Sequence, residues 1–158
     1  MVVGWREWVA LPQLDIPAIK AKIDTGAKTS ALHAHYIEPF SEGGIEKIKF
    51  GIRPIRKRTK LELHCVADIL DRRVVSDSGG HREERFVIQT IVELAGARWP
   101  IEMTLTNRDT MLFRMLLGRS AMADRFIVQP GESFLHGRRK SRDYYPLAQS
   151  SESRKHEE

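Results

Sequence analysis

One carboxylate at the end of a predicted strand has the clearest potential for chemistry in this chain. Asp24, Thr25 and Gly26 follow an alternating apolar segment, and the sequence Asp-Thr-Gly occurs only there. Glycine tolerates a sharp turn and lets a second backbone approach, so this loop would hold the carboxylate rigidly. Thr25 could hold the turn by a local hydrogen bond. An ordinary Asx turn explains the same tripeptide, so the tripeptide alone leaves a structural and a catalytic interpretation open.

A second segment downstream favours the catalytic interpretation. Residues 115–117 are apolar and lead into Gly118 and Arg119. The stretch that begins at Gly118, GRSAMADRF, is long enough for two helical turns, and Ser120 is placed to cap them. The pattern predicts an apolar strand that ends in glycine and continues directly into a short helix.

Alternating apolar and polar residues predict the strands that must position these groups. Before Asp24, the side chains of Ile19, Ala21 and Ile23 face one way, and the polar residues between them face the other. The same period occurs in residues 32–36, 48–52, 61–69, 86–94 and 101–105; in the first of these, His33 and His35 oppose the apolar side chains. The last two segments predict a hairpin that turns at residues 95–97. We expect an all-β domain with one short helix, built as a barrel or closed sandwich.

Two polar stretches interrupt this pattern. Residues 71–85 are polar and carry Gly79 and Gly80 in their middle, followed by His81, as a mobile hairpin tip would. From residue 136 onward the apolar period is lost. We therefore predict a domain over residues 1–135 and a polar C-terminal tail over residues 136–158 whose end is disordered.

Composition sets broad limits on the function. The chain has 158 residues, of which 41% are hydrophobic, and a net charge of +5. This size fits one domain with a sizeable core. The single cysteine, Cys65, lies in a strand-like context and cannot form an intrachain disulfide, so we expect a buried structural thiol. No segment resembles a signal peptide or a membrane helix, which predicts a cytoplasmic protein without a membrane partner.

Three segments together carry a resemblance to a known family. They are KIDTGAKTSALHA, GGHREERFVI and LTNRDTMLFRMLLGR. The first and last resemble the retroviral-type aspartic proteases, in which an apolar strand ending in glycine passes beside the active-site loop. The combination, over about residues 5–135, is similar to the bacterial and archaeal retropepsin-like proteins called ATP-dependent zinc proteases. Members of that group are often encoded near, or fused to, ATP-grasp peptide ligases such as RimK.

The resemblance implies a retropepsin-like closed β-barrel that hydrolyses peptide bonds as a homodimer. In such enzymes one aspartate takes a proton from water while a second, protonated aspartate donates a hydrogen bond to the scissile carbonyl. This chain supplies one such residue, Asp24, so a second chain must supply the other. The loop would then comprise Thr25, Gly26 and Ala27. Gly118 would permit close packing behind it, Arg119 would brace the loop or the dimer, and residues 76–85 would form a flap.

The zinc and the ATP in that family name find no support in the residues. HREER contains His81 and Glu84, but Arg85 stands where an inverted zinc motif needs histidine. His33 and His35 would provide two ligands from one strand face, without a third at a convincing spacing. The sequence contains no phosphate-binding P-loop motif. We expect no metal and no cofactor.

Other functions remain open beside peptide hydrolysis. The same fold could serve as a non-catalytic peptide-binding module that recognises a glutamate-rich tail made by a ligase partner. Lys28 could bind an acidic peptide, although such a lysine is more often simply exposed. A nucleic-acid-binding barrel would need exposed aromatic residues beside the basic run at residues 53–60, which contains none. We therefore do not expect a nucleic-acid partner.

Overall fold

The structure is a computed structural model that describes residues 1–76, 79–108 and 111–146. Its elements, in chain order, are β1 (Val2–Val3), β2 (Arg6–Leu11), the 3-10 helix η1 (Pro12–Leu14), β3 (Ile16–Asp24), β4 (Ser30–His33), β5 (Tyr36–Glu42), β6 (Ile45–Ile52), β7 (Leu63–Asp68), β8 (Asp71–Ser76), β9 (Arg82–Leu94), β10 (Ala97–Thr106), β11 (Met115–Gly118), α1 (Arg119–Met122), β12 (Ile127–Val128) and α2 (Ser141–Tyr144). The predicted all-β class is confirmed. The short helix expected after Gly118 is α1, and α2 is a second one.

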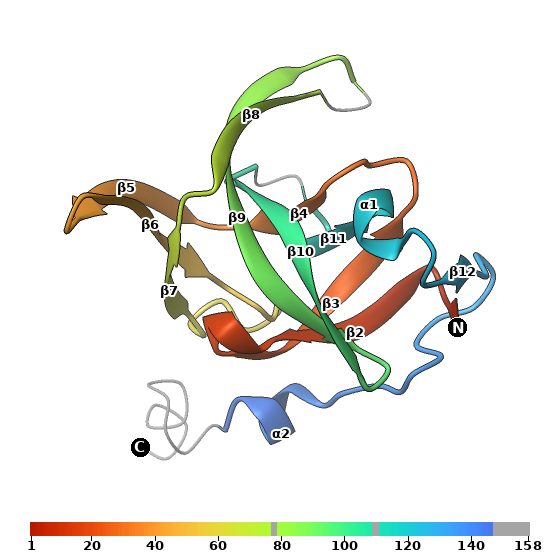
Figure 1. Cartoon of the computed structure of the whole chain (residues 1–158). Coiled ribbons are helices and arrows are strands. Elements are labelled where there is room, and N and C mark those ends of the chain that lie inside the picture. The colour runs from red at the N-terminus through yellow and green to blue at the C-terminus, as the bar shows by residue number, and fades with distance from the viewer. Residues whose placement is uncertain (77–78, 109–110, 147–158) are drawn as a thin grey trace.

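Six strands form a barrel (Figure 1). They are hydrogen-bonded in the order β10-β4-β11-β3-β2-β9, and the pairing of β9 with β10 closes the ring. The ring is not closed evenly, because β2 and β9 pair at one position, Ala10 with Glu93. Strands β5, β6 and β7 form a separate three-stranded sheet, and β1 pairs with β12. This arrangement places the ends of β3 and β11 side by side.

The alternation predicted for β3 is confirmed by its burial. Ile19, Ala21 and Ile23 are in the core, whereas Lys22 is exposed and Lys20 and Asp24 are half-buried. The hairpin of β9 and β10 turns at Ala95 and Gly96, which both have positive φ, as the sequence predicts. Such a turn matches the right-handed twist of the two strands it joins. Burial raises the pKa of the Cys65 thiol to about 11, in agreement with the predicted structural role.

One local prediction is wrong. Ser120 does not cap α1; it lies inside the helix, and Gly118 occupies the N-cap position without a side-chain hydrogen bond. In β4, the predicted alternation of Leu32 with His33 does not separate a buried from an exposed face, since both residues are buried. Arg114 Nη1 lies 3.2 Å from His33 Nδ1. Strand β4 is buried along its whole length, so alternation could not distinguish its two faces.

The predicted loop at residues 71–85 is mostly a hairpin of two strands. Strand β8 pairs with the start of β9 from Asp71–Val87 to Ser76–Arg82. The hairpin rises away from the barrel (Figure 1). Its arms are largely exposed, so they carry no clear apolar period that would have identified them as strands.

The segment predicted as a polar tail contacts the barrel in the part that the structure describes. The hydroxyl of Tyr145, a buried residue, donates a hydrogen bond to the Ala18 carbonyl at 2.6 Å. The carboxylate of Glu7, which is also buried, accepts hydrogen bonds from the amides of Leu135 and His136. The domain boundary at residue 135 stays a prediction, and the predicted disordered end lies outside the described residues. No helix in the described part of the chain is long and apolar enough to cross a membrane.

Candidate active site

Asp24 is the last residue of β3, and the backbone that follows holds its carboxylate. Oδ1 accepts a hydrogen bond from the Gly26 amide at 3.0 Å, and the Asp24 carbonyl accepts one from the Ala27 amide at 3.3 Å. A Cβ atom at position 26 would lie 3.2 Å from Oδ1, which is tighter than ordinary contact. These bonds form an Asx turn, and this turn also holds the Asp24 carboxylate at the end of the strand. The structural and the catalytic interpretation of the tripeptide therefore do not exclude each other.

Strand β11 runs parallel to β3 and places Gly118 directly opposite Asp24. A Cβ atom at Gly118 would lie 2.7 Å from the Thr29 carbonyl carbon and 2.9 Å from the Ser30 nitrogen. Any larger residue would push the loop away, so close packing at this point requires glycine. The Gly118 amide donates a hydrogen bond to the buried Ser30 Oγ at 3.0 Å.

The first turn of α1 holds the loop from its other side. The amides of Arg119 and Ser120 donate hydrogen bonds to the carbonyls of Ala27, at 2.8 Å, and Lys28, at 3.0 Å. The guanidinium of Arg119 donates a further bond to the Gly26 carbonyl at 3.2 Å. The structure therefore brings together the two distant segments whose residues were predicted to form the site, the loop after Asp24 and the start of α1. It places Arg119 against the loop.

Ser30 also belongs to this arrangement, although its role was not predicted from the sequence. Ser30 begins β4, its Oγ binds the Gly118 amide, and its carbonyl accepts a hydrogen bond from Thr104 Oγ1 at 3.2 Å. A small polar residue at the start of an apolar strand is the available signal, but it does not reveal the partner. Thr25, by contrast, is exposed, and its hydroxyl makes no hydrogen bond within the described residues. The Gly26 amide holds the turn instead.

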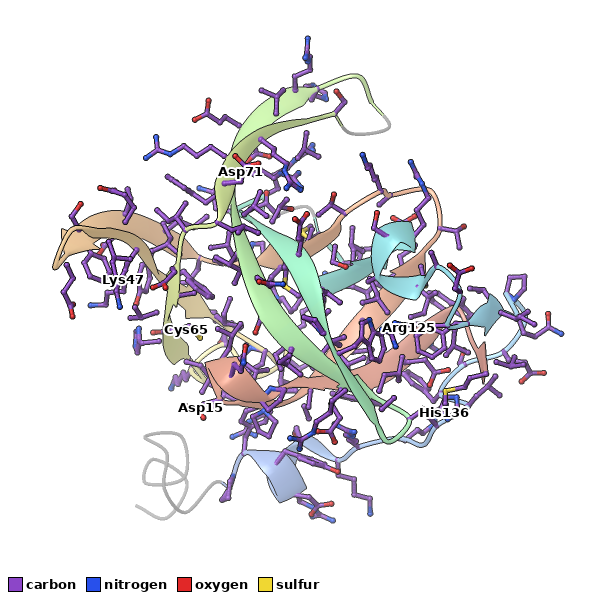
Figure 2. All side chains as sticks on the ribbon, in the orientation of Figure 1. Asp15, Lys47, Cys65, Asp71, Arg125 and His136 are labelled. Carbon is purple, nitrogen blue, oxygen red and sulfur yellow. The ribbon has the colours of Figure 1, made fainter. Side chains whose placement is uncertain are left out.

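A chain of charged groups connects this loop to the β8–β9 hairpin. Arg73 donates hydrogen bonds to Glu102 at 2.6 and 3.1 Å and to Asp71 at 2.9 Å. The hydrogen bond from Arg73 is the main cause that lowers the pKa of Glu102, and the positive charge of Lys28 contributes in the same direction. Lys28 therefore lies within the electrostatic reach of Glu102. Figure 2 shows Asp71 at the base of the hairpin.

The predicted flap corresponds to the tip of this hairpin. Gly79, Gly80 and His81 are exposed, and Gly80 has a positive φ of 82°. Residues 77 and 78 of the predicted flap lie outside the described residues. The hairpin and the β3–β4 loop with Asp24 lie on the same side of the barrel, the upper side in Figure 1. This placement is compatible with a flap, and the role itself stays a prediction.

The described residues contain no group of three or more histidine, cysteine, aspartate or glutamate side chains that could hold a metal ion. At His33, one of the two histidines considered as ligands, the cationic guanidinium of Arg114 lies 3.2 Å from Nδ1. A second cation would be repelled at this nitrogen. Absence of zinc remains a prediction. Elemental analysis of the purified protein checks it, and about one tightly held zinc per chain would contradict it.

Comparison with known proteins gives a consistent result. A family model described as "Retropepsin-like aspartic endopeptidase RimB" matches residues 2–139. Proteins named "Probable alpha-L-glutamate ligase" from Shewanella pealeana and Desulfotalea psychrophila are 46% identical over 136 and 129 residues. These matches cover 86% and 82% of this chain, but 30% and 28% of the relatives. This chain thus spans about 30% of the length of the curated relatives that it matches.

A solved structure supports the fold. A Legionella pneumophila protein of unknown function superposes with a TM-score of 0.70 at 27% sequence identity. The superposition covers 85% of this chain and 96% of that one.

Proposed function

This chain belongs to the RimB-like family of retropepsin-like aspartic endopeptidases, and on that premise we propose that it hydrolyses peptide bonds. The attacking water would be activated by two Asp24 carboxylates, one from each chain of a homodimer. The observation that carries this proposal is the fixed position of Asp24 between β11, α1 and the start of β4.

The chemistry follows from placing two carboxylates close together. Two carboxylates that nearly touch cannot both be ionised, so the pair shares one proton. The ionised Asp24 takes a proton from water as the water oxygen attacks the scissile carbonyl carbon. The protonated Asp24 of the other chain donates a hydrogen bond to the carbonyl oxygen, where negative charge develops. The protein forms no covalent bond to the peptide.

The proposed pair takes its second carboxylate from another copy of this chain. Asp-Thr-Gly occurs once, and the nearest variant in the sequence, at residues 77–79, comes after the largely exposed strand β8 rather than after a core strand. Thr25, Gly26 and Lys28 are exposed, so the Asp24 loop is open on the side where a second copy would bind. A two-fold axis through this side would bring the two carboxylates together.

The relatives support a second candidate, a peptide-binding module that does not cleave. Their name, "Probable alpha-L-glutamate ligase", and their length fit a domain that works beside an ATP-grasp ligase. Such a module would recognise a glutamate-bearing tail made by the ligase. Lys28, exposed beside the Asp24 loop, would contribute a positive charge to that recognition. In both candidates the ligase is the functional partner.

A cleavage and binding assay distinguishes the two candidates. Wild-type protein and Asp24→Asn are each incubated with peptides that carry or lack a glutamate tail. Asparagine keeps the shape of the side chain but cannot accept the proton of water. We expect the wild type to cleave and Asp24→Asn to lose about 100-fold or more of the rate, with peptide binding retained. Asp124→Asn is the matched control, since Asp124 is exposed and its φ of 63° suits asparagine. Binding by both proteins without cleavage by either would leave the module as the function.

A further inference from the structure

A cluster of cations around aromatic rings lies on the outer face of β2 and β3. Arg6 and Lys20 come from these strands, Lys57 from the loop after β6, and Arg138 from the C-terminal segment. The charged groups of Arg6, Lys20 and Arg138 lie 4.7, 5.6 and 4.6 Å from the centre of the Phe134 ring. Lys20 also lies 5.5 Å from the ring of Trp8, its register partner in β2. We call Arg6, Lys20, Lys57 and Arg138, with Trp8 and Phe134, the basic–aromatic face.

Ion pairs within the described residues do not neutralise the positive charge of this face. None of its four cations forms an ion pair with a carboxylate of the described residues. Burial is the main cause that lowers the pKa of Lys20, and the charges of Arg6, Lys57 and Arg138 lower it further. Crowded like charges without a counter-charge favour the binding of an anion at the same place.

The C-terminal segment extends the face toward the basic run at residues 53–60. Arg58 donates a hydrogen bond to the Tyr145 carbonyl at 3.0 Å, which joins this run to the segment. Next to it, the Arg139 guanidinium lies 5.3 Å from the centre of the Tyr144 ring, which is 38% exposed. The basic run lacks aromatic residues in sequence, but the bond between Arg58 and Tyr145 places the neighbouring Tyr144, an exposed residue, beside it. A nucleic-acid surface needs an exposed aromatic residue beside the basic run, and the fold supplies one that the sequence of the run itself lacks.

We propose that the basic–aromatic face, together with Tyr144, binds single-stranded nucleic acid, with its cations on the phosphates and its exposed ring on the bases. Proteins that bind single strands combine a positive surface that follows the backbone with aromatic side chains on which bases stack. Arginine guanidinium planes stack on unpaired bases as well. Phe134 is buried beneath the cations, so Tyr144 is the ring that is exposed to a ligand. An acidic peptide would use the cations but would gain nothing from this ring, so the exposed ring favours a nucleic acid.

The face is separate from the candidate active site. Lys20 and Asp24 belong to the same outward-facing set of β3, four residues apart, which corresponds to about 13 Å along a strand. Nucleic-acid binding would therefore leave Asp24 accessible, and Asp24→Asn should bind the strand like the wild type. The inference is independent of whether the chain cleaves peptides.

Fluorescence anisotropy with labelled oligo(dT) and oligo(rU) of about 20 nucleotides tests the proposal. The test variant combines Lys57→Glu with Arg138→Glu, and both residues are exposed. The matched control combines Lys49→Glu with Arg125→Glu, which are also exposed and cause the same change in net charge. Arg125 lies 4.8 Å from the Trp99 ring, so each variant loses one lysine and one ring-stacked arginine. Arg125 is labelled in Figure 2. Circular dichroism of each variant checks that it folds.

We expect the test variant to bind about tenfold or more weakly than the wild type, and the control to stay within about twofold. The slope of log affinity against log salt, between about 50 and 200 mM, should decrease by about 1.4 or more in the test variant alone. Tyr144→Ala should weaken binding by about fivefold or more. Three results would overturn the proposal: no binding by the wild type at the lower salt concentration, equal losses in both double variants, or equally strong competition by a polyglutamate peptide at the same charge concentration.

Discussion

The loop that carries Asp24 and the hairpin of β8 and β9 are held in place by different kinds of interaction. The Asp24 loop receives backbone hydrogen bonds from Gly118, Arg119 and Ser120, with Gly118 packed against it more closely than any other residue would allow. At its base the hairpin has exposed ion pairs of Arg73 with Asp71 and Glu102. Two longer, partly buried hydrogen bonds of 3.4 Å join Arg85 to Thr104 and Thr106 to Glu83. Buried hydrogen bonds are costly to leave unsatisfied, whereas exposed ion pairs contribute little.

This difference fits the demands of the proposed reaction. A group that activates water must be held within a fraction of an ångström of its working position, which requires a rigid loop. A cover over the substrate must open and close, which requires a region that can move at low cost. The same barrel thus supplies a closely packed loop and a hairpin whose arms are largely exposed.

The largest effect that tests this comparison is expected from Gly118→Ala. The added Cβ would meet backbone atoms of Thr29 and Ser30, which cannot move without displacing the loop. We expect the free energy of unfolding to fall by about 1–3 kcal/mol, together with a loss of peptidase activity. Gly131→Ala is the matched control, because nothing lies within 4 Å of its Cβ position. Equal stability of the two variants in urea denaturation would show that the close contact does not hold the loop.

Ser30→Ala should have the next largest effect. It removes the acceptor of the buried Gly118 amide, which then has no partner and no access to water. We expect a loss of about 1–2 kcal/mol in the free energy of unfolding. Ser41→Ala removes an exposed hydroxyl that bonds to Glu46, and it should change stability by less than about 0.5 kcal/mol. If the two variants lose the same amount, the rigidity of the loop has another origin.

Hydrogen exchange should show the difference between the two regions directly. The amides of Gly118, Arg119 and Ser120 should exchange slowly in the free protein, whereas those of residues 79–85 should exchange fast and become protected when a peptide binds. Strong and equal protection of residues 79–85 in the free and bound protein would count against a flap.

The smallest expected effect concerns the ion pair at the base of the hairpin. Arg73→Met should speed exchange in β8 by no more than about fivefold at neutral pH. The lowered pKa of Glu102 means that its bond to Arg73 stabilises the folded state at neutral pH. That contribution is lost as the pH falls through the folded-state pKa, which lies below the usual value. Wild-type and variant exchange rates in β8 should therefore converge in acid; a difference that persists there would assign the effect to packing instead.

Sequence reasoning performed best where a single strand carries its own signal. The alternation around Ile19, Ala21 and Ile23 predicts both β3 and the outward side of Asp24, because one face of that strand is buried. In β4 the alternation of Leu32 with His33 did not reveal that both faces of the strand are buried. The arms of the β8–β9 hairpin were missed as strands for the opposite reason, because they are largely exposed.

The candidate site was predictable in its residues but not in its connections. Asp24, Gly26, Gly118 and Arg119 carry recognisable signals in the sequence. The hydrogen bonds of Ser30 and the packing of Tyr145 on Ala18 depend on segments far apart in the chain. The same is true of the basic–aromatic face. No local pattern specifies such contacts, because they arise only when the barrel closes.

Subunit mixing tests the central claim, that Asp24 works only in pairs, most directly. Wild-type chains are refolded together with increasing amounts of Asp24→Asn, and peptidase activity is measured per wild-type chain. If each active site needs two carboxylates, activity should fall to about half in an equal mixture and to about a tenth with a ninefold excess of the variant. Activity that stays constant per wild-type chain at every ratio would show that one Asp24 suffices, and it would contradict the paired mechanism.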